Sequence, residues 1–373
     1  MSRPLKVTIA AGGTAGHINP ALALAEELRD RGHDVHFVGQ STRLEATLVP
    51  QAGFPFSTVE VTGFDRSRPW TLVTAVVRMA LAERALGKIF ASEGAPDVAV
   101  GFGAYVELPL VRWCAHHKVP YALHEQNSVP GLANKVSARQ ASALCLSFPA
   151  AETAFAGRTG SQTKICVTGN PVRRSVVDAT RADGRERFGI KEDETLLLVF
   201  GGSLGARHLN QGVTALKEQL LERPKLRIIH STGRDEYDSV VEALALSDEE
   251  AARWQVMPYI DDMGLALAAA DLVLSRAGAS SVAEIAAKAV PSMLVPYPFA
   301  TADHQTTNAH LLVDEGAAVL LPDDEIDSPA FAEMLLGLVD DAGRRDDMRA
   351  AAHRLAQDRA AAELADAVEA LVS

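Results

Sequence analysis

The sequence is poor in several features that would mark a specialised class of protein. It has three cysteines among 373 residues, Cys114, Cys145 and Cys166. They stand far apart in the sequence and match no metal-ligand spacing, so the sequence predicts neither a disulfide framework nor a zinc site. This usage is typical of a reduced, cytoplasmic protein.

Long apolar runs are also missing. A transmembrane helix needs about 18 or more consecutive apolar residues, and the nearest run, PWTLVTAVV at 69–77, ends at Arg78. A strand-like stretch, LKVTIAA at 5–11, begins almost at the first residue, without the charged segment and cleavage site of a secretory signal. We therefore expect neither a membrane span nor a signal peptide.

Motifs for metal binding and for hydrolysis are absent from the sequence. There is no H-E-x-x-H, no D-x-D before an acidic pocket and no paired Cys/His spacing. The G-x-S-x-G pattern of the hydrolases is missing as well. The sequence predicts no metal site and no cofactor.

Positive charge is scarce overall, because the formal net charge is -12. The first 170 residues carry 16 Lys and Arg against 13 Asp and Glu, whereas the remaining residues carry 20 against 35. An acidic chain disfavours general nucleic-acid binding. The mildly basic first half is compatible with an anionic lipid surface.

What the sequence does contain is a regular alternation of short apolar strands and amphipathic helices. This alternation predicts parallel sheets covered by helices on both faces. The predicted strands are 5–11, 34–38, 56–61, 97–101, 120–124, 142–147 and 164–168 in the first half, and 195–200, 226–231, 254–257, 271–275, 292–296 and 318–321 in the second.

The two halves begin alike. The first strand of one leads into GGTAGH at 12–17, and the first strand of the other leads into GGSLGAR at 201–207. We therefore predict an α/β fold of two Rossmann-like, doubly wound domains with a cleft between them. The first domain would span 1–168, joined by a C-terminal helix at about 345–373, and the second would span 169–344.

Neither glycine-rich turn is a dinucleotide fingerprint. That fingerprint requires G-x-G-x-x-G and an acidic residue at the end of the second strand. Here that strand ends VHFVGQ at 35–40, without a carboxylate. The sequence therefore argues against NAD and against a dehydrogenase.

The first turn has the composition of an anion site. Asn19 is expected to cap the following helix with Pro20 at its first position, so His17 would lie on the loop at the carboxyl end of the first strand. Ligands of open α/β sheets bind at that edge, where backbone N–H groups favour an anion. A tight turn with a hydrogen-bonded histidine is the alternative.

Two further loops of the first domain end at the same edge. They are GFGAYVELP at 101–109 and HEQNSVPGLANK at 124–135. Their polar residues are predicted to line one pocket, although ordinary loop polarity would explain them too. The residues concerned are Gly103, Tyr105, His124, Glu125, Gln126 and Asn127.

In the second domain, SRAGASSVAE at 275–284 follows a strand and begins a helix. Ser281 and Glu284 have the spacing of a capping box, which would explain both residues without a ligand. Arg276 and the small residues at 278–279 are left unexplained by that alternative. They favour a diphosphate at the helix N-terminus, with the Glu284 carboxylate on the hydroxyls of a ribose.

The segment YPFATADHQTTNA at 297–309 predicts another helix start. Asp303 would cap it, which places His304 and Gln305 on the first turn. Amide and imidazole groups there would suit sugar hydroxyls, and simple helix capping explains the pattern equally well.

Taken together in order and spacing, these motifs resemble the MurG family, peripheral membrane glycosyltransferases that make lipid II in peptidoglycan synthesis. The motifs are GGTAGHINPALALAEEL, HEQNSVPGLANK, VTGNPVR, FGGSLGARHLN, YIDDM, SRAGASSVAEI and DHQTTNA. The resemblance implies a GT-B fold with the acceptor in the first domain and the donor in the second. It also implies inverting transfer of GlcNAc from UDP-GlcNAc to the C4 hydroxyl of the MurNAc of lipid I.

The resemblance also implies which residues bind each substrate. The residues expected to bind UDP-GlcNAc are Thr14, Asn127, Arg173, Ser203, Ile260, Arg276, Ala279, Ser280, Ser281, Glu284, His304 and Gln305. The residues expected to bind the acceptor and its pyrophosphate are Gly13, Thr14, Ala15, Gly16, Gly103, Tyr105, His124, Glu125 and Asn127.

The sequence departs from the family pattern in two acceptor loops. Ala15 stands where the family usually has glycine, and an alanine there requires a negative φ. Glu107 and Leu108 stand where the family usually has Ser-Gly, so Glu107 is expected to bring a negative charge close to the pyrophosphate.

The mechanism is expected to use His17 as the base that takes the proton from the attacking hydroxyl, since imidazole ordinarily titrates near 6.5. Arg276 and the helix N-terminus at 279–281 would stabilise the departing UDP without a metal. The alternatives are another UDP-sugar enzyme of this fold, such as a UDP-GlcNAc 2-epimerase, and a UDP-sugar-binding scaffold without catalysis.

The segment 65–88 predicts a membrane surface, because its apolar residues are denser than one buried stripe requires and basic residues flank them. A crossover helix packed on its sheet is the alternative. The apolar residues are Trp70, Leu72, Val73, Val76, Val77 and Met79, and the basic ones are Arg66, Arg68, Arg78 and Lys88. We expect a peripheral protein on the cytoplasmic face of the bacterial cell membrane. Its expected partners are UDP-GlcNAc, lipid I and anionic lipid, with other cell-wall synthesis or division proteins left open.

Overall fold

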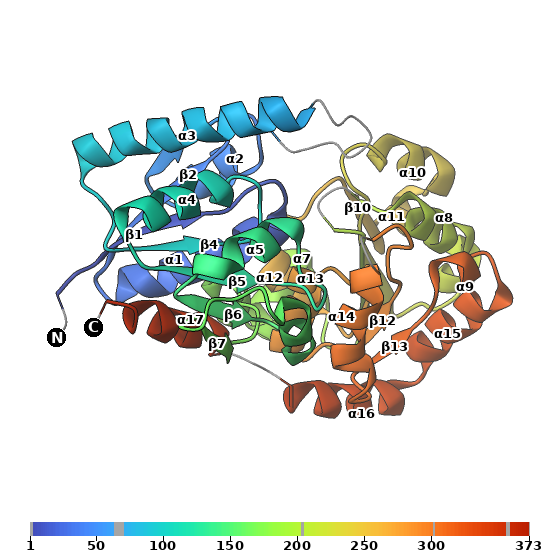
Figure 1. Ribbon diagram of the computed structural model, residues 1–373. Coiled ribbons are helices and arrows are strands. Elements are labelled where there is room, and N and C mark those ends of the chain that lie inside the picture. Colours follow the sequence, from blue (N-terminus) through green and yellow to red (C-terminus); the bar gives the residue numbers. More distant parts are fainter. Residues whose placement is uncertain (1–2, 63–70, 203–204, 301–302, 356–358, 373) are drawn as a thin grey trace. The chain divides into compact units, whose positions relative to one another are not determined.

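The computed structural model of the protein describes residues 3–62, 71–202, 205–300, 303–355 and 359–372, with side chains from 74 onward in the helix that begins at Thr71. The chain divides into two compact units, Met1–Arg173 with Arg359–Ser373, and Arg174–Asp358 (Figure 1).

The first unit is built on a parallel sheet of the order β3-β2-β1-β4-β5-β6-β7 in the described part of the chain. Every strand predicted for this half is present, with ends within a few residues of the prediction. The strands are β1 (Lys6–Ala10), β2 (Asp34–Gly39), β3 (Phe56–Thr58), β4 (Val98–Gly101), β5 (Tyr121–Glu125), β6 (Ala143–Leu146) and β7 (Lys164–Val167).

Helices cover both faces of this sheet, as the alternating pattern predicts (Figure 1). One face packs against α1, α2 and the C-terminal helix, and the other against α3, α4 and the α5 region. The helical segments are α1 (Ala15–Asp30), α2 (Glu45–Gln51), α3 (Thr71–Glu93), α4 (Glu107–His117), α5 (Leu132–Ser137), η1 (Ala138–Gln140) and η2 (Pro149–Phe155).

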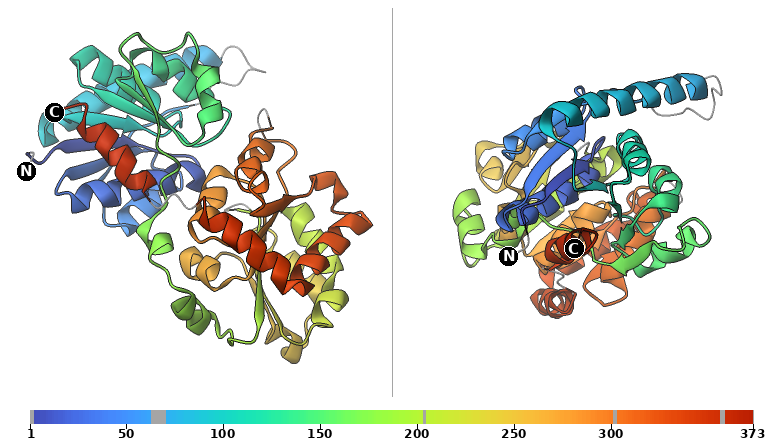
Figure 2. Two further views of the ribbon diagram at one scale, coloured as in Figure 1. Left: turned by 90° about the horizontal axis from the view of Figure 1, so that it is seen from below. Right: turned by 60° about the vertical axis from the view of Figure 1, so that its left-hand side comes forward.

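The C-terminal helix α17 (Ala360–Glu369) belongs to the first unit, where it packs against α1. Figure 2 shows it as the red helix beside the C label, among the blue and green elements of that unit. The chain returns at Arg359, later than the expected 345, because α16 (Ala342–His353) packs on α13 and α15 in the second unit. The first crossing, at 173/174, lies close to the expected 168/169.

The second unit repeats the plan with the strand order β10-β9-β8-β11-β12-β13 among the described residues. All strands predicted for this half are again present. They are β8 (Thr195–Phe200), β9 (Leu226–Ser231), β10 (Trp254–Met257), β11 (Leu272–Ser275), β12 (Ser292–Leu294) and β13 (Ala318–Leu320).

One face of this sheet packs on α8, α10 and α15, and α12 packs on α7. The remaining helical segments are α6 (Arg174–Val177), α7 (Arg181–Phe188), α8 (Arg207–Ala215), α9 (Lys217–Leu221), α10 (Tyr237–Leu244), α11 (Asp248–Ala251), α12 (Met263–Ala269), α13 (Ala279–Ala287), α14 (His304–Val313), η4 (Asp323–Glu325) and α15 (Pro329–Asp340). The doubly wound α/β prediction is therefore confirmed for both units.

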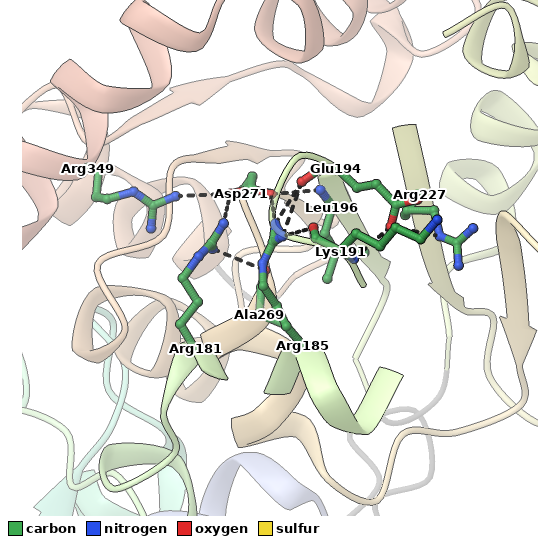
Figure 3. Close-up of polar contacts among 9 residues, drawn as sticks. All are labelled: Arg181, Arg185, Lys191, Glu194, Leu196, Arg227, Ala269, Asp271 and Arg349. Carbon is green, nitrogen blue, oxygen red and sulfur yellow. Dashed lines mark hydrogen bonds and ion pairs between the residues drawn. The ribbon is translucent and has the colours of Figure 1, made fainter. Parts of the chain in front are cut away.

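A buried ionic cluster holds the amino edge of the second sheet (Figure 3). Asp271 accepts hydrogen bonds from the backbone N–H of Leu196 at 2.8 Å, from Arg185 at 3.0 Å and from Arg181 at 2.6 Å. Burial opposes the charge of Asp271, but these donors hold its pKa below the usual range. Since Leu196 lies in β8 and Asp271 directly precedes β11, the cluster ties the two central strands together.

Two of the cysteines are neighbours in space although they are far apart in the sequence. Cys145 and Cys166 are paired across β6 and β7, with their sulfur atoms 3.4 Å apart as free thiols.

Candidate active site

The order of each sheet fixes where its loops can bind a ligand. In the first sheet the order in which successive strands are added reverses between the parallel neighbours β1 and β4, and in the second sheet between β8 and β11. Ligands of open α/β sheets bind at the carboxyl ends of the strands at such a switch point. The two loops at each switch point are the glycine-rich turns and loops predicted from the sequence.

His17 lies beside the loop that follows β4. A β-carbon placed on Gly103 would be 3.6 Å from Cδ2 of His17 and 3.1 Å from Nδ2 of Asn134. The three predicted acceptor loops of the first unit therefore meet around Gly103. Its φ of +84° is a left-handed conformation that favours glycine.

The predicted start of the first helix was wrong. Helix α1 begins at Ala15 with Thr14 as its N-cap, because the Thr14 carbonyl accepts from the N–H groups of His17 and Ile18. Asn19 is no cap, and Pro20 lies within the helix. Ala15 is helical, so its φ is negative as an alanine requires.

His17 is consequently a first-turn residue rather than a loop residue. Its side chain is half-buried, and its Nδ1 atom is 3.1 Å from the hydroxyl of Thr14. A hydroxyl within hydrogen-bonding distance of Nδ1 restricts the orientation of the imidazole ring.

Two fully buried glutamates hold two of these loops in place by accepting hydrogen bonds from their backbone. Glu45 accepts from the N–H of Gly13 at 3.0 Å and from that of Gln40 at 3.0 Å. Glu107 accepts from the N–H of Gly103 at 2.6 Å and from the hydroxyl of Ser137 at 3.1 Å. The N–H groups of Gly13 and Gly103 therefore point into the protein rather than toward a bound anion.

We expected Glu107 to bring a negative charge close to the pyrophosphate, but the structure places no exposed charge there from this residue. Its side chain is fully buried, and burial raises its pKa to about 8, although the bond from Gly103 opposes that shift. There is room for the carboxylate because Gly101 has no side chain: a β-carbon there would lie 2.6 Å from a Glu107 oxygen. Near neutral pH the protonated, uncharged form of Glu107 is therefore favoured, and its side chain connects Gly103 to Ser137 inside the protein.

The third loop is braced by Glu125. This carboxylate accepts from the N–H groups of Asn127 and Gly131, both at 3.0 Å, and from the side chain of Asn134 at 2.9 Å. Glu125 is buried, and burial raises its pKa. It shapes the loop from within and does not line its surface.

His124 is also internal. Burial lowers the pKa of His124 to about 4, and its Nε2 atom is 3.1 Å from the Gly169 carbonyl. Gln126 is buried and donates to the carbonyl of Phe102. His124, Glu125 and Gln126 are thus buried in this structure and hydrogen-bonded within the unit, whereas Tyr105 is 41% exposed at the loop surface.

Arg173, expected near the join of the two units, is held by Glu26 of α1. Its guanidinium donates two hydrogen bonds, of 3.1 and 2.9 Å, to one Glu26 oxygen. This pair anchors the end of the first unit to α1.

The donor loops predicted for the second unit meet at its own switch point. Helix α13 begins at Ala279 with Gly278 as its N-cap. Ser281 is therefore the third residue of the helix, so the capping box predicted for Ser281 and Glu284 is wrong. The backbone N–H groups of Ala279, Ser280 and Ser281 form the first turn, where a helix has no acceptors of its own.

Glu284 lies one turn further along α13 and is half-buried. A carboxylate one turn from a diphosphate-binding helix start is placed to accept from the hydroxyls of an attached ribose. Ile260 lies at the carboxyl end of β10 with its side chain buried. Ser203 falls outside the described residues.

Arg276 is buried and paired inside the second unit. It contacts Asp323 at 2.5 Å and donates to the carbonyls of Val295 and Pro296 at 3.1 Å. Asp323 is also 2.8 Å from Nδ1 of His208, and this contact raises the pKa of His208. The expected contact of Arg276 with a diphosphate would have to coexist with these partners.

The segment before α14 is fixed by Gln305. Its side-chain oxygen accepts from the N–H of Tyr297 at 2.9 Å and from that of Ala277 at 3.2 Å. Asp303 is the N-cap as predicted, although its carboxylate accepts from the hydroxyl of Thr306 rather than from the backbone. His304 is the first residue of the helix and is half-buried.

Part of the predicted membrane surface can be located. On α3, Val76 is 49% and Val77 is 53% exposed, and Met79 is half-buried. Trp70 and the side chains of Leu72 and Val73 lie outside the described residues.

Membrane-spanning helices and metal-binding clusters are both absent from the described residues. No helix among them is long and apolar enough to cross a membrane. They contain no group of three or more His, Cys, Asp or Glu side chains that could hold a metal ion.

Two family models match the chain. The glycosyltransferase family 28 N-terminal domain matches residues 7–145, and the glycosyltransferase family 28 C-terminal domain matches residues 196–369. Together with the paired switch-point loops, these matches define a glycosyltransferase of the GT-B fold.

Its relatives narrow this class. Proteins of Halothermothrix orenii, 36% identical over 371 residues, and of Desulforudis audaxviator, 38% identical over 374 residues, each match over 98% of both chains. Both are named UDP-N-acetylglucosamine--N-acetylmuramyl-(pentapeptide) pyrophosphoryl-undecaprenol N-acetylglucosamine transferase. The crystal structure of Acinetobacter baumannii MurG matches with a TM-score of 0.73 at 29% identity, over 98% of this chain and 100% of that one. The chain belongs to the MurG family of glycosyltransferase family 28.

More distant structures share only the fold. A putative UDP-N-acetylglucosamine 2-epimerase from Listeria monocytogenes matches with a TM-score of 0.69 at 14% identity, over 99% of this chain and 96% of that one. The epimerase alternative thus rests on architecture alone.

Several supporting residues were missed by sequence reasoning. Glu45 and Asn134 brace acceptor loops, and Asp323 pairs with Arg276. Glu45 and Asp323 stand in stretches without a recognisable motif, and their partners are distant in the sequence. Asn134 lies within a quoted motif, so its position next to a buried carboxylate was the one available signal.

Proposed function

We propose that the protein transfers GlcNAc from UDP-GlcNAc to the C4 hydroxyl of the MurNAc of lipid I, giving lipid II and UDP with inversion at the sugar. The observation that carries this proposal is the full-length relationship to transferases of that name, at 36–38% identity over 98% of each chain. The positions of the proposed residues support it, because Ala279, Ser281 and Glu284 lie at the start of α13 in the second unit and His17 lies beside Gly103 in the first.

His17 is the proposed base. The C4 oxygen of the acceptor attacks C1 of GlcNAc while the bond from C1 to the diphosphate oxygen breaks, UDP leaves, and the proton of the C4 hydroxyl passes to His17. The Thr14 hydroxyl, 3.1 Å from Nδ1, would accept a hydrogen bond from Nδ1–H in the tautomer in which Nε2 carries the basic lone pair.

The departing UDP is proposed to be stabilised at the start of α13. The first-turn N–H groups of Ala279, Ser280 and Ser281 offer donors to the diphosphate, and Glu284 binds the ribose. The reaction is expected to need no cofactor, because the sequence carries no metal-binding motif and UDP-GlcNAc is counted as a substrate.

We also propose peripheral binding to the cytoplasmic face of the bacterial membrane. The exposed Val76 and Val77, with Arg78 beside them, support an interfacial contact of α3. The protein should sediment with anionic vesicles at low salt and less so at high salt. Absence of sedimentation at low salt would contradict this part of the proposal.

The test of the function is acceptor-dependent release of UDP. With UDP-GlcNAc alone the protein should release no UDP, and adding lipid I should start the release. Consumption of UDP-GlcNAc without an acceptor would favour the epimerase. Binding without consumption in the presence of lipid I would favour a scaffold.

A further inference from the structure

We propose that an apolar groove beside Tyr105 binds the first isoprenoid units of the acceptor's polyprenyl chain. This inference rests on the proposed function, because it assumes a prenyl diphosphate acceptor. The groove lies within the first unit and encloses a cavity of about 200 Å³. Its main walls are Ala75 and Met79 of α3, Tyr105 and Leu108 of the loop and start of α4, and Leu132 and Val136 of α5.

The groove is continuous with the predicted acceptor loop. Tyr105 and Leu108 belong to the segment that the bond from Gly103 to Glu107 holds in place, and Gly103 adjoins His17. In a prenyl diphosphate the apolar chain begins directly at the phosphate. An apolar surface that starts at the loop beside His17, where the acceptor diphosphate is proposed to bind, therefore matches the connectivity of this ligand.

The chemistry of the lining excludes the other parts of the acceptor. None of the described residues that line the groove is charged, and Thr62 and Tyr105 supply its only polar side-chain groups. Sugar hydroxyls and peptide carboxylates lose free energy in such a place unless they find hydrogen-bonding partners. A hydrocarbon chain needs none.

The groove is also open to its ligand. Val136 is 63%, Val76 49% and Leu132 44% exposed along its rim. Contiguous exposed apolar surface on a soluble domain commonly marks a binding site.

Its size suits a short length of chain. An apolar cavity of about 150 Å³ takes up a benzene-sized molecule, so this groove has room for at least one branched five-carbon unit. Each buried methylene is worth roughly a fourfold gain in affinity. The groove would thus distinguish a prenylated acceptor from one without a chain.

The test uses water-soluble acceptors, so that membrane binding does not enter. The MurNAc-pentapeptide diphosphate is prepared with either a methyl group or a ten-carbon, two-isoprenoid chain. The wild-type protein should have a KM at least roughly 10-fold lower for the ten-carbon acceptor. Ala75→Phe, which fills the groove, should remove that difference and leave the KM of the methyl acceptor unchanged.

Ala80→Phe is the matched control, because Ala80 is exposed on the same helix and does not line the groove. It should keep the wild-type preference. If Ala75→Phe fails to fold, Val136→Asp serves as the second variant, because Val136 is exposed on the rim of the groove. It should raise the KM for the ten-carbon acceptor and leave the KM for the methyl acceptor unchanged.

The outcomes separate the two proposals. Equal KM values for both acceptors in the wild type, or an equal rise in both KM values in the variants, would contradict the proposed chain-binding groove. The proposed transferase function would be unaffected by that result. If neither acceptor gave a product, the proposed function would be contradicted, and the proposed groove with it.

Discussion

The carboxylate of Glu107 accepts a hydrogen bond of 2.6 Å from the backbone N–H of Gly103. The same side chain accepts from the hydroxyl of Ser137, 30 residues further along the chain. One buried group thus joins the loop after β4 to the end of α5. The shape of the loop beside His17 depends on a residue that no solvent or ligand reaches.

Two replacements of Glu107 distinguish the contribution of its hydrogen bonds to stability from the contribution of its charge. Glu107→Ala leaves the Gly103 N–H and the Ser137 hydroxyl without this acceptor and should lower the free energy of unfolding by about 1–3 kcal/mol or more. Glu107→Gln keeps an acceptor oxygen and should be much milder near neutral pH. Chemical denaturation of both variants measures the difference, and an equal loss in both would contradict the interpretation that Glu107 is protonated and uncharged near neutral pH.

The pH dependence of the same pair has a defined sign. Burial raises the pKa of Glu107 from 4.5 to about 8, so the folded protein holds a proton there that the unfolded chain has released. This group therefore lowers stability progressively as the pH rises from about 4.5 to about 8. Glu107→Gln should gain stability relative to the wild type over that interval, and a constant difference from pH 5 to pH 9 would contradict the account.

His17→Ala should lower turnover by roughly 10²–10⁴-fold, the usual contribution of a general base. Binding of UDP-GlcNAc should be nearly unchanged, because His17 is assigned to the acceptor. His116→Ala is the control, since His116 is exposed and pairs with Glu83 on the surface. Near-normal turnover of His17→Ala would remove His17 from the mechanism.

Glu284→Gln should raise the KM for UDP-GlcNAc by roughly 10- to 100-fold, the worth of one charge-assisted hydrogen bond. The KM for the acceptor should stay close to that of the wild type. Glu333→Gln, at an exposed position of α15, should change neither value. An effect of Glu284→Gln on stability alone would instead favour a structural role.

Asp271→Asn should destabilise the second unit by roughly 3 kcal/mol at pH 7, because it leaves the buried Arg185 without its charged partner. Since the pKa of Asp271 is lowered, its contribution is present above the ordinary value of 3.8 and is lost as the pH falls through the folded value. The wild type and variant should therefore converge only when the pH has fallen below the folded pKa of Asp271, which itself lies below 3.8. Asp193→Asn, in an exposed pair with Lys225, is the control and should leave the stability nearly unchanged.

The strands were predictable from the sequence, because apolar runs between helical patterns are local signals. The parallel order then follows from the fold class and brings 12–17 to 101–109 in one unit and 201–207 to 275–284 in the other. Family membership, confirmed by relatives over the full length, came from the ordered set of motifs.

The sequence did not predict correctly where two helices begin, and it did not predict that several polar side chains are buried. Asn19 and Ser281 have the residue types of caps, but Thr14 and Gly278 occupy those positions in the structure. His124 and Glu125 are polar and end a strand, which a sequence alone cannot distinguish from a ligand-facing pair. Their burial is decided by contacts with Gly169 and Asn134 that only the tertiary structure provides.

Removal of divalent cations tests the expectation of metal-free transfer, which the missing metal motifs suggest. Activity in excess EDTA should equal that in Mg²⁺-containing buffer. Loss of turnover on chelation, restored by Mg²⁺ alone, would show that the diphosphate needs a cation in addition to the α13 N-terminus.

The most direct measurement of the central claim is the structure of the product formed from UDP-GlcNAc and lipid I. The account predicts one disaccharide per UDP released, with GlcNAc joined in the β configuration to the C4 oxygen of MurNAc, as inversion of the α-linked donor requires. An α linkage, attachment at another hydroxyl, or an epimerised UDP-sugar in place of a disaccharide would contradict it.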